Sequence, residues 1–196
     1  NFNFNIFLYF DLDDVFVPEH FAITTPGQRR GGAIFRMGYA FAANEHAIFA
    51  LALAQQALDS FISSSQKKRG YGKGANIADR EIVQRAVAES ELRLRGAKLL
   101  MTDVLEHLFD ASSDQEAPIA LQAETRAASV LCTDEAIVIV NTLFRYAGGS
   151  AVMLDDPMQR ILRDLYTVQS DLMVSDATYE ALDKLRSKLT DKAPLR

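Results

Sequence analysis

Hydrophobic and polar positions follow two different rhythms along this chain. Residues 1–10 alternate polar and apolar side chains at a period of two before becoming wholly apolar, which predicts a β-strand. Prolines and glycines between Pro18 and Gly32 then mark irregular structure. From about Ile34 to the end, the apolar positions recur at helical spacing. We therefore expect a short β segment followed by an all-α domain.

Two long helical segments open the second part of the chain. The first, residues 34–66, is rich in alanine and apolar on almost all sides, so we expect it at the centre of the fold. The second, residues 77–111, is amphipathic, with one apolar stripe and charged positions opposite. The stripe comprises Val83, Val87, Ser90, Leu94, Ala97, Met101, Val104 and Leu108.

The next two helical segments carry clear signals at their ends. Residues 118–147 begin at a proline suited to a first helical turn, and two glycines follow as a C-terminal stop. The fourth segment begins with Asp156 as N-cap and Pro157 at the first helical position. A second cap signal, Ser175-Asp176, predicts a break before a last helix over residues 179–189.

Long helices joined by short connections predict an all-α, up-down four-helix bundle. We assign residues 31–196 to this bundle, and residues 1–30 to the end of a preceding β domain and its linker. Because the sequence has no initiator methionine and opens in a strand pattern, we expect it to start inside a larger polypeptide.

Composition and charge argue against several classes of protein. With 196 residues, 48% of them hydrophobic, the chain can form one domain with a sizeable core. A net charge of −5 without a basic stripe argues against nucleic-acid binding. The apolar stretch at residues 47–54 is too short to cross a bilayer, so we expect no membrane span. The single cysteine, Cys132, is expected to be a reduced, buried thiol, which suits a cytoplasmic protein.

Metal and hydrolytic chemistry find little support in the sequence. His20, His46 and His107 are dispersed and form no ligand pattern, so we expect no metal site. His46 lies in the most apolar segment and is interpreted as a hydrogen-bonded core histidine rather than a catalyst. No Ser-His-Asp order or nucleophile elbow occurs.

Two glycine-bearing joints are the stronger candidates for a binding site. Residues 67–73 and residues 145–150 each combine cations, an aromatic ring and glycine backbone. Such a combination suits binding of a phosphate together with a planar ring. Plain helix caps are the alternative interpretation of both joints.

Four motifs then occur in the order typical of one family. Residues 10–19, FDLDDVFVPE, resemble the last strand of the middle β domain of acyl-CoA dehydrogenases. Residues 68–73 are similar to that family's basic turn after the first bundle helix, and residues 146–150 to its Gly-Gly turn after the third. Residues 157–164, PMQRILRD, match its P-x-x-(R/K)-x-x-R-D. The chain resembles the C-terminal bundle of the acyl-CoA dehydrogenase superfamily over nearly its whole length.

The resemblance implies a flavin site and self-association. The bundle would assemble as a dimer or a dimer of dimers, and both glycine turns would contact the flavin, FAD or FMN, of a neighbouring subunit. Lys68 and Tyr71 would meet its phosphate or ring. Gly148, Gly149 and Ser150 would lie against it through backbone amides. Other domains or a neighbouring subunit would complete the site.

Two chemistries within the family differ at the end of the fourth helix. The common dehydrogenases place a catalytic glutamate at the position of Leu172, and a leucine cannot take a proton. The flavin monooxygenase branch resembles this chain in residues 148–152 and places a histidine at the position of Asp171. Asp171 is therefore our candidate catalytic residue, with a plain helix carboxylate as the alternative.

We interpret the chain as part of a flavin-dependent oxidoreductase. The closer branch is the two-component monooxygenases (hydroxylases), which would use a small-molecule substrate and a flavin reductase as partner. Acyl-CoA dehydrogenation with a base from elsewhere, and a non-catalytic oligomerisation module, remain the alternatives. Under each of these interpretations, the fragment alone is expected to be inactive.

Overall fold

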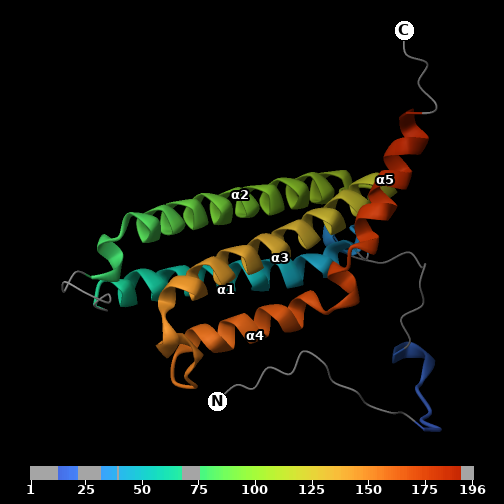
Figure 1. Cartoon of the computed structure of the whole chain (residues 1–196). Helices are drawn as coiled ribbons and strands as arrows, with labels where there is room; N and C mark the ends of the chain where they lie inside the picture. Colours follow the sequence, from blue (N-terminus) through green and yellow to red (C-terminus); the bar gives the residue numbers. More distant parts are fainter. Residues whose placement is uncertain (1–12, 22–31, 39, 68–75, 191–196) are drawn as a thin grey trace.

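The computed structural model describes residues 13–21, 32–38, 40–67 and 76–190, and its long helices form a bundle. Its main elements are α1 (Ala40–Ser65), α2 (Glu81–Ala111), α3 (Ile119–Ala147), α4 (Pro157–Gln169) and α5 (Ala177–Thr190). Short 3-10 turns accompany them: η1 (Glu19–Phe21), η2 (Ala33–Arg36), η3 (Ile77–Asp79), η4 (Gly149–Val152) and η5 (Leu172–Val174). In Figure 1, α1 to α4 run side by side and α5 crosses one end of the bundle. The prediction of an all-α four-helix bundle is confirmed.

Helix α3, rather than α1, is the central element. It packs against α1, α2, α4 and α5. The sequence predicted a central place for the first helical segment, but α1 leaves Ile48 and Phe49 exposed. The reason is that α1 buries only one face, made largely of small side chains that let α3 approach closely. That face includes Ala43, Ala47, Ala50, Ala54, Ala57, Leu58 and Phe61.

The apolar stripe of α2 lies where the sequence placed it. Seven of its eight predicted members are buried, and Val87 is half-buried while its neighbour Ala86 takes the buried position. This agreement follows from the spacing, because positions three or four apart share one face of a helix.

The core accommodates polar side chains along α3 without unpaired hydroxyls. Thr125, Ser129 and Thr133 are buried, and each hydroxyl donates a hydrogen bond to the carbonyl four residues earlier, at 2.8 to 2.9 Å. These local bonds remove the cost of burying a hydroxyl group. Cys132 is a free, buried thiol that donates to the Ala97 carbonyl at 3.3 Å, and burial is the main reason why its pKa rises to about 11. The prediction of a buried thiol is confirmed.

The first bundle helix begins later than the sequence predicted, at Ala40 rather than at residue 34. The first predicted helix is divided at Gly38, whose φ of 71° is in the left-handed region. The chain before Gly38 is fixed to the α2–α3 connection: Arg36 donates to the carbonyls of Ser112 and Ser113, and its own carbonyl accepts from Ala117. At α4, the predicted cap is confirmed, because the Asp156 side chain accepts from the Met158 N–H at 3.0 Å.

Three sequence-based expectations remain predictions. The strand at residues 1–10 lies outside the described residues, and the described stretch 13–21 contains only η1, so the division at residue 30 is untested. Helices α1 and α3 are long and apolar enough to cross a membrane by length and composition. That observation is weak, because buried core helices meet the same criteria and 61% of the α3 window is buried. The expected absence of a membrane span therefore stays a prediction.

Candidate functional site

The predicted site residues that the structure describes lie at two opposite ends of the bundle. Lys68 and Tyr71 lie outside the described residues. The turn formed by residues 148–150 joins α3 to α4 at one end, and Asp171 follows α4 at the other (Figure 1). Helix α4 has 13 residues, so at a rise of 1.5 Å per residue the two groups are about 20 Å apart along it. One subunit therefore does not bring Asp171 to the glycine turn.

The glycine turn presents open backbone. Gly148 has φ 81° and ψ 177°, a conformation that only glycine adopts readily, and Gly149 begins η4. Gly148, Gly149 and Ser150 are all exposed. A Cβ atom built on either glycine meets nothing within 4 Å. A ligand could therefore approach this backbone closely.

A cation and an aromatic ring lie on the last turn of α3, directly before the glycine turn. The guanidinium carbon of Arg145 lies 6.0 Å from the centroid of the Tyr146 ring. Tyr146 packs against the core, which fixes its ring, whereas Arg145 is exposed. This arrangement suits a ligand that carries both a negative charge and a planar group.

Asp171 caps the short turn that follows α4. One oxygen of its carboxylate, Oδ1, accepts a hydrogen bond from the Met173 N–H at 2.8 Å. The other oxygen, Oδ2, lies 3.4 Å from Nε2 of His46, a residue of the neighbouring helix α1. The side chains of Asp171 and His46 are 22% and 18% exposed. The candidate catalytic carboxylate is thus held by a backbone amide and faces an imidazole.

His46 is therefore more than the core histidine that the sequence suggested. Its Nδ1 is buried and has no hydrogen-bond partner, while Nε2 faces Asp171 and the side chain is partly open to solvent. Sequence reasoning treated the two residues separately, because they lie far apart in the chain and no local pattern joins them. The sequence signal was a single histidine in the most apolar of the predicted helices.

A second group of titratable side chains joins α3 to the segment around Asp171. The Gln169 amide donates to Asp134 of α3 at 3.0 Å. Burial raises the pKa of Asp134, and the negative charges of Asp176 and Glu135 add to this effect, while the hydrogen bond from Gln169 opposes it. Burial also raises the pKa of Tyr179, with further contributions from Asp134 and Asp176. No local motif marks Asp134 in the sequence.

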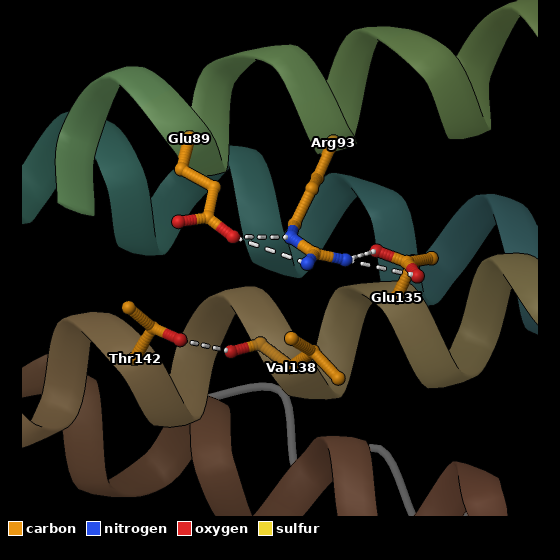
Figure 2. Close-up of polar contacts among 5 residues, drawn as sticks. All are labelled: Glu89, Arg93, Glu135, Val138 and Thr142. Carbon is orange, nitrogen blue, oxygen red and sulfur yellow. Dashed lines mark hydrogen bonds and ion pairs between the residues drawn. The ribbon is translucent and has the colours of Figure 1, made fainter. Parts of the chain in front are cut away.

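The flank of the bundle carries an ion bridge that serves packing. Arg93 of α2 lies between Glu89 on its own helix and Glu135 on α3, at 3.1 Å and 2.9 Å, and Thr142 on α3 donates to the Val138 carbonyl at 2.8 Å (Figure 2). The guanidinium of Arg93 thereby joins α2 to α3 through the two carboxylates. Among the described residues, no three His, Cys, Asp or Glu side chains are placed to hold a metal ion.

Solved structures share this fold at low sequence identity. XiaF from a Streptomyces species, in complex with FADH2 and glycerol, has a TM-score of 0.71 at 18% identity over 80% of this chain. The 3-HSA hydroxylase from Rhodococcus has a TM-score of 0.68 at 17% identity over 80% of this chain. The nitroalkane oxidase of Podospora anserina has a TM-score of 0.65 at 16% identity over 79% of this chain. The chain spans only 40%, 40% and 35% of these proteins, respectively.

Sequence comparison identifies the family directly. No curated protein matches the chain significantly. Residues 45–176, more than half of the chain, match the family described as "Acyl-CoA dehydrogenase, C-terminal domain". The matched range runs from the first bundle helix to the turn before α5 and includes His46, the glycine turn and Asp171. This chain belongs to the family of acyl-CoA dehydrogenase C-terminal domains.

Proposed function

We propose that the chain is the C-terminal bundle of a two-component flavin monooxygenase. The carrying observation is the end of α4: Leu172, at the position where the dehydrogenases would have their base, is 79% exposed and cannot take a proton, whereas its neighbour Asp171 faces His46. Two of the similar structures support this assignment, one a hydroxylase and the other a complex with reduced flavin. A small-molecule substrate and a separate flavin reductase would be the partners.

The residues fit a flavin in separate roles. FAD or FMN would supply the redox chemistry when bound. Gly148, Gly149 and Ser150 would hold it through their backbone, since their turn is exposed and nothing occupies the space near the two glycines. Lys68 and Tyr71 would add contacts to its phosphate or ring. Because the glycine turn and Asp171 lie at opposite ends of α4, we propose that the turn contacts the flavin of a neighbouring subunit.

Asp171 would take or return a proton during the reaction. Its Oδ1 is occupied by a backbone amide, while Oδ2 keeps a lone pair for a further contact. A side chain that is 22% exposed can be reached from outside the bundle. Positioned proton transfer of this kind contributes about 100-fold to 10,000-fold in rate.

Self-association and a cytoplasmic location complete the proposal. The outer faces of the bundle expose Ile48 and Phe49 on α1 and Leu131 and Val138 on α3. Exposed apolar side chains of this kind suit an interface between copies of the protein, as a dimer or a dimer of dimers. One similar structure is the ChsE4–ChsE5 complex of Mycobacterium tuberculosis, with a TM-score of 0.55 at 18% identity. The single buried thiol, Cys132, suits a reducing compartment.

Acyl-CoA dehydrogenation is the second candidate, favoured by the family match itself. Since Leu172 cannot act as a base, Asp171 or a residue of another domain would have to remove the proton. The third candidate is an oligomerisation module without catalysis. Flavin bound by the full-length protein would exclude the third candidate.

Anaerobic mixing separates the first two candidates. The full-length, flavin-loaded protein is mixed with a panel of acyl-CoA thioesters, and the absorbance of oxidised flavin is followed. The monooxygenase proposal expects no loss of that absorbance, and expects a transient absorbance, distinct from oxidised and reduced flavin, when the reduced protein meets O2. Rapid bleaching by a thioester would instead establish a dehydrogenase.

A further inference from the structure

Resting on the function proposed above, we infer that His46 is the positioning residue for Asp171. In this arrangement, the imidazole on α1 fixes the carboxylate at the end of α4 in the orientation that exchanges a proton. Two elements far apart in the chain thereby form one proton-handling unit.

The geometry of the carboxylate gives the first reason. The Met173 N–H holds Oδ1 at 2.8 Å, but a single hydrogen bond leaves the other oxygen free to swing. Nε2 of His46 lies 3.4 Å from Oδ2 and supplies a second point of contact. That distance is long for a hydrogen bond. Catalytic contacts often shorten only when the substrate is bound.

The surroundings of the imidazole give the second reason. Nδ1 is buried without a hydrogen-bond partner, so a proton on Nδ1 would have no acceptor. Nε2 has the carboxylate in front of it and is the nitrogen suited to carry the proton. The ring is therefore directed to Asp171 alone among its described partners.

A second histidine–aspartate pair in the chain provides a contrast. His107 and Asp103 lie one turn apart on α2 at 3.7 Å, with side chains 66% and 64% exposed. Water screens such a pair, so it has little effect on either partner. His46 and Asp171 come from different elements, and most of each side chain is buried. Of the two pairs, only His46 and Asp171 restrict the orientation of the carboxylate.

Kinetics of the full-length, flavin-loaded protein test this role. We expect Asp171→Asn to lower kcat about 100-fold and His46→Leu to lower it about 10-fold with KM nearly unchanged. His46→Gln, which keeps an N–H donor, should regain most of that loss. The double variant, His46→Leu with Asp171→Asn, should be no slower than Asp171→Asn alone, since a positioning residue acts only through its partner. His107→Gln is the matched control and should have no effect.

A spectroscopic measurement tests the contact without relying on activity. In histidine-selectively ¹⁵N-labelled full-length protein, the signals lost in His46→Gln belong to His46. We expect them to show the tautomer protonated at Nε2, and to shift in Asp171→Asn while the His107 signals stay in place. Unfolding curves of every variant identify any loss that arises from misfolding.

The outcomes separate the two proposals. A protein that binds no flavin overturns the proposed function, and the inference with it. Flavin turnover that falls in Asp171→Asn but not in His46→Leu overturns the inference alone. Equal losses in His46→Leu and His46→Gln, or strictly multiplicative losses in the double variant, would also exclude a positioning role.

Discussion

The two ends of this bundle offer a ligand different chemistry. At the glycine end, residues 148–150 present exposed backbone, and the nearest aromatic ring, Tyr146, is anchored in the core. At the acidic end, the candidate groups are partly buried side chains that can gain or lose protons: Asp171, His46 and Asp134. Backbone amides hold an anion at any ordinary pH, whereas side chains of the second kind move protons. The difference indicates binding at one end and chemistry at the other.

Helix α4 sets the distance between the two ends. Its buried side consists of Met158, Ile161, Leu165 and Val168, which attach it to the core along its whole length. If the two ends belong to sites of different subunits, this helix couples binding in one subunit to chemistry in the next. The following changes test the comparison, from the largest expected effect to the smallest.

The largest effect is expected from Leu165→Ala, which should disturb both ends. Leu165 is fully buried in α4, so removing its side chain leaves a cavity and costs about 2–5 kcal/mol of stability. Denaturant unfolding of the full-length protein measures the loss, and flavin affinity and turnover should fall together. Leu172→Ala, at an exposed position, is the control and should leave stability unchanged. Loss at only one end would show that α4 does not link them.

The glycine end can be divided by two neighbouring substitutions. Gly148→Ala should cost about 1–3 kcal/mol, because φ of 81° disfavours any side chain although space is available. Gly149→Ala should change stability by less than about 0.5 kcal/mol. If the backbone here contacts flavin, however, Gly149→Ala should weaken flavin binding clearly in a fluorescence titration. If Gly149→Ala folds and its flavin affinity is unchanged, the turn serves only as a helix cap.

At the acidic end, Asp134→Asn should stabilise the protein at neutral pH by a few tenths, at most about 1 kcal/mol. Burial raises the pKa of Asp134 above its ordinary 3.8, so folding favours the protonated carboxyl and its charge lowers stability above the raised pKa. The gain in Tm should therefore be present at pH 7 and vanish as the pH falls through the raised pKa towards 3.8.

Gln169→Leu provides the matched variant of opposite sign. It removes the hydrogen bond that lowers the pKa of Asp134, so it should decrease Tm at pH 7 and have less effect in the Asp134→Asn background. A gain in Asp134→Asn that persisted at low pH would show that the carboxyl is not desolvated.

The smallest effect is expected on the flank, away from both ends. A double-mutant cycle of Arg93→Gln and Glu135→Gln should give a coupling of about 0.2–1 kcal/mol, because both side chains of the bridge (Figure 2) are partly exposed to solvent. Added salt should reduce it further, and turnover should not change. A coupling above about 2 kcal/mol would mean that this flank is covered in the full protein.

Much of the fold could be predicted because local signals and packing agree. The α2 stripe and the Asp156-Pro157 start of α4 follow from spacing and capping alone. The break at Gly38 was missed, because one glycine among alanines does not reveal its backbone conformation. The central role of α3 was also missed, since it depends on which faces meet in three dimensions.

The candidate site was predictable only in part. The glycine turn and Asp171 carry motif information, so the sequence could select them. The contact between Asp171 and His46 could not be selected, because it joins two elements that only the folded bundle brings together. Asp134 escaped notice for the same reason, since its raised pKa comes from burial at the junction of α3 with the turn before α5.

The anchored stretch before α1 has a mechanical consequence. Arg36 donates hydrogen bonds to the Ser112 and Ser113 carbonyls, and the Ala117 N–H donates one to the Arg36 carbonyl. A Cβ atom at Gly38 would meet the side-chain amide of Gln122. Together these contacts hold residues 36–38 against the α2–α3 connection. A force on residues 32–38 is therefore carried by the α2–α3 connection through these hydrogen bonds.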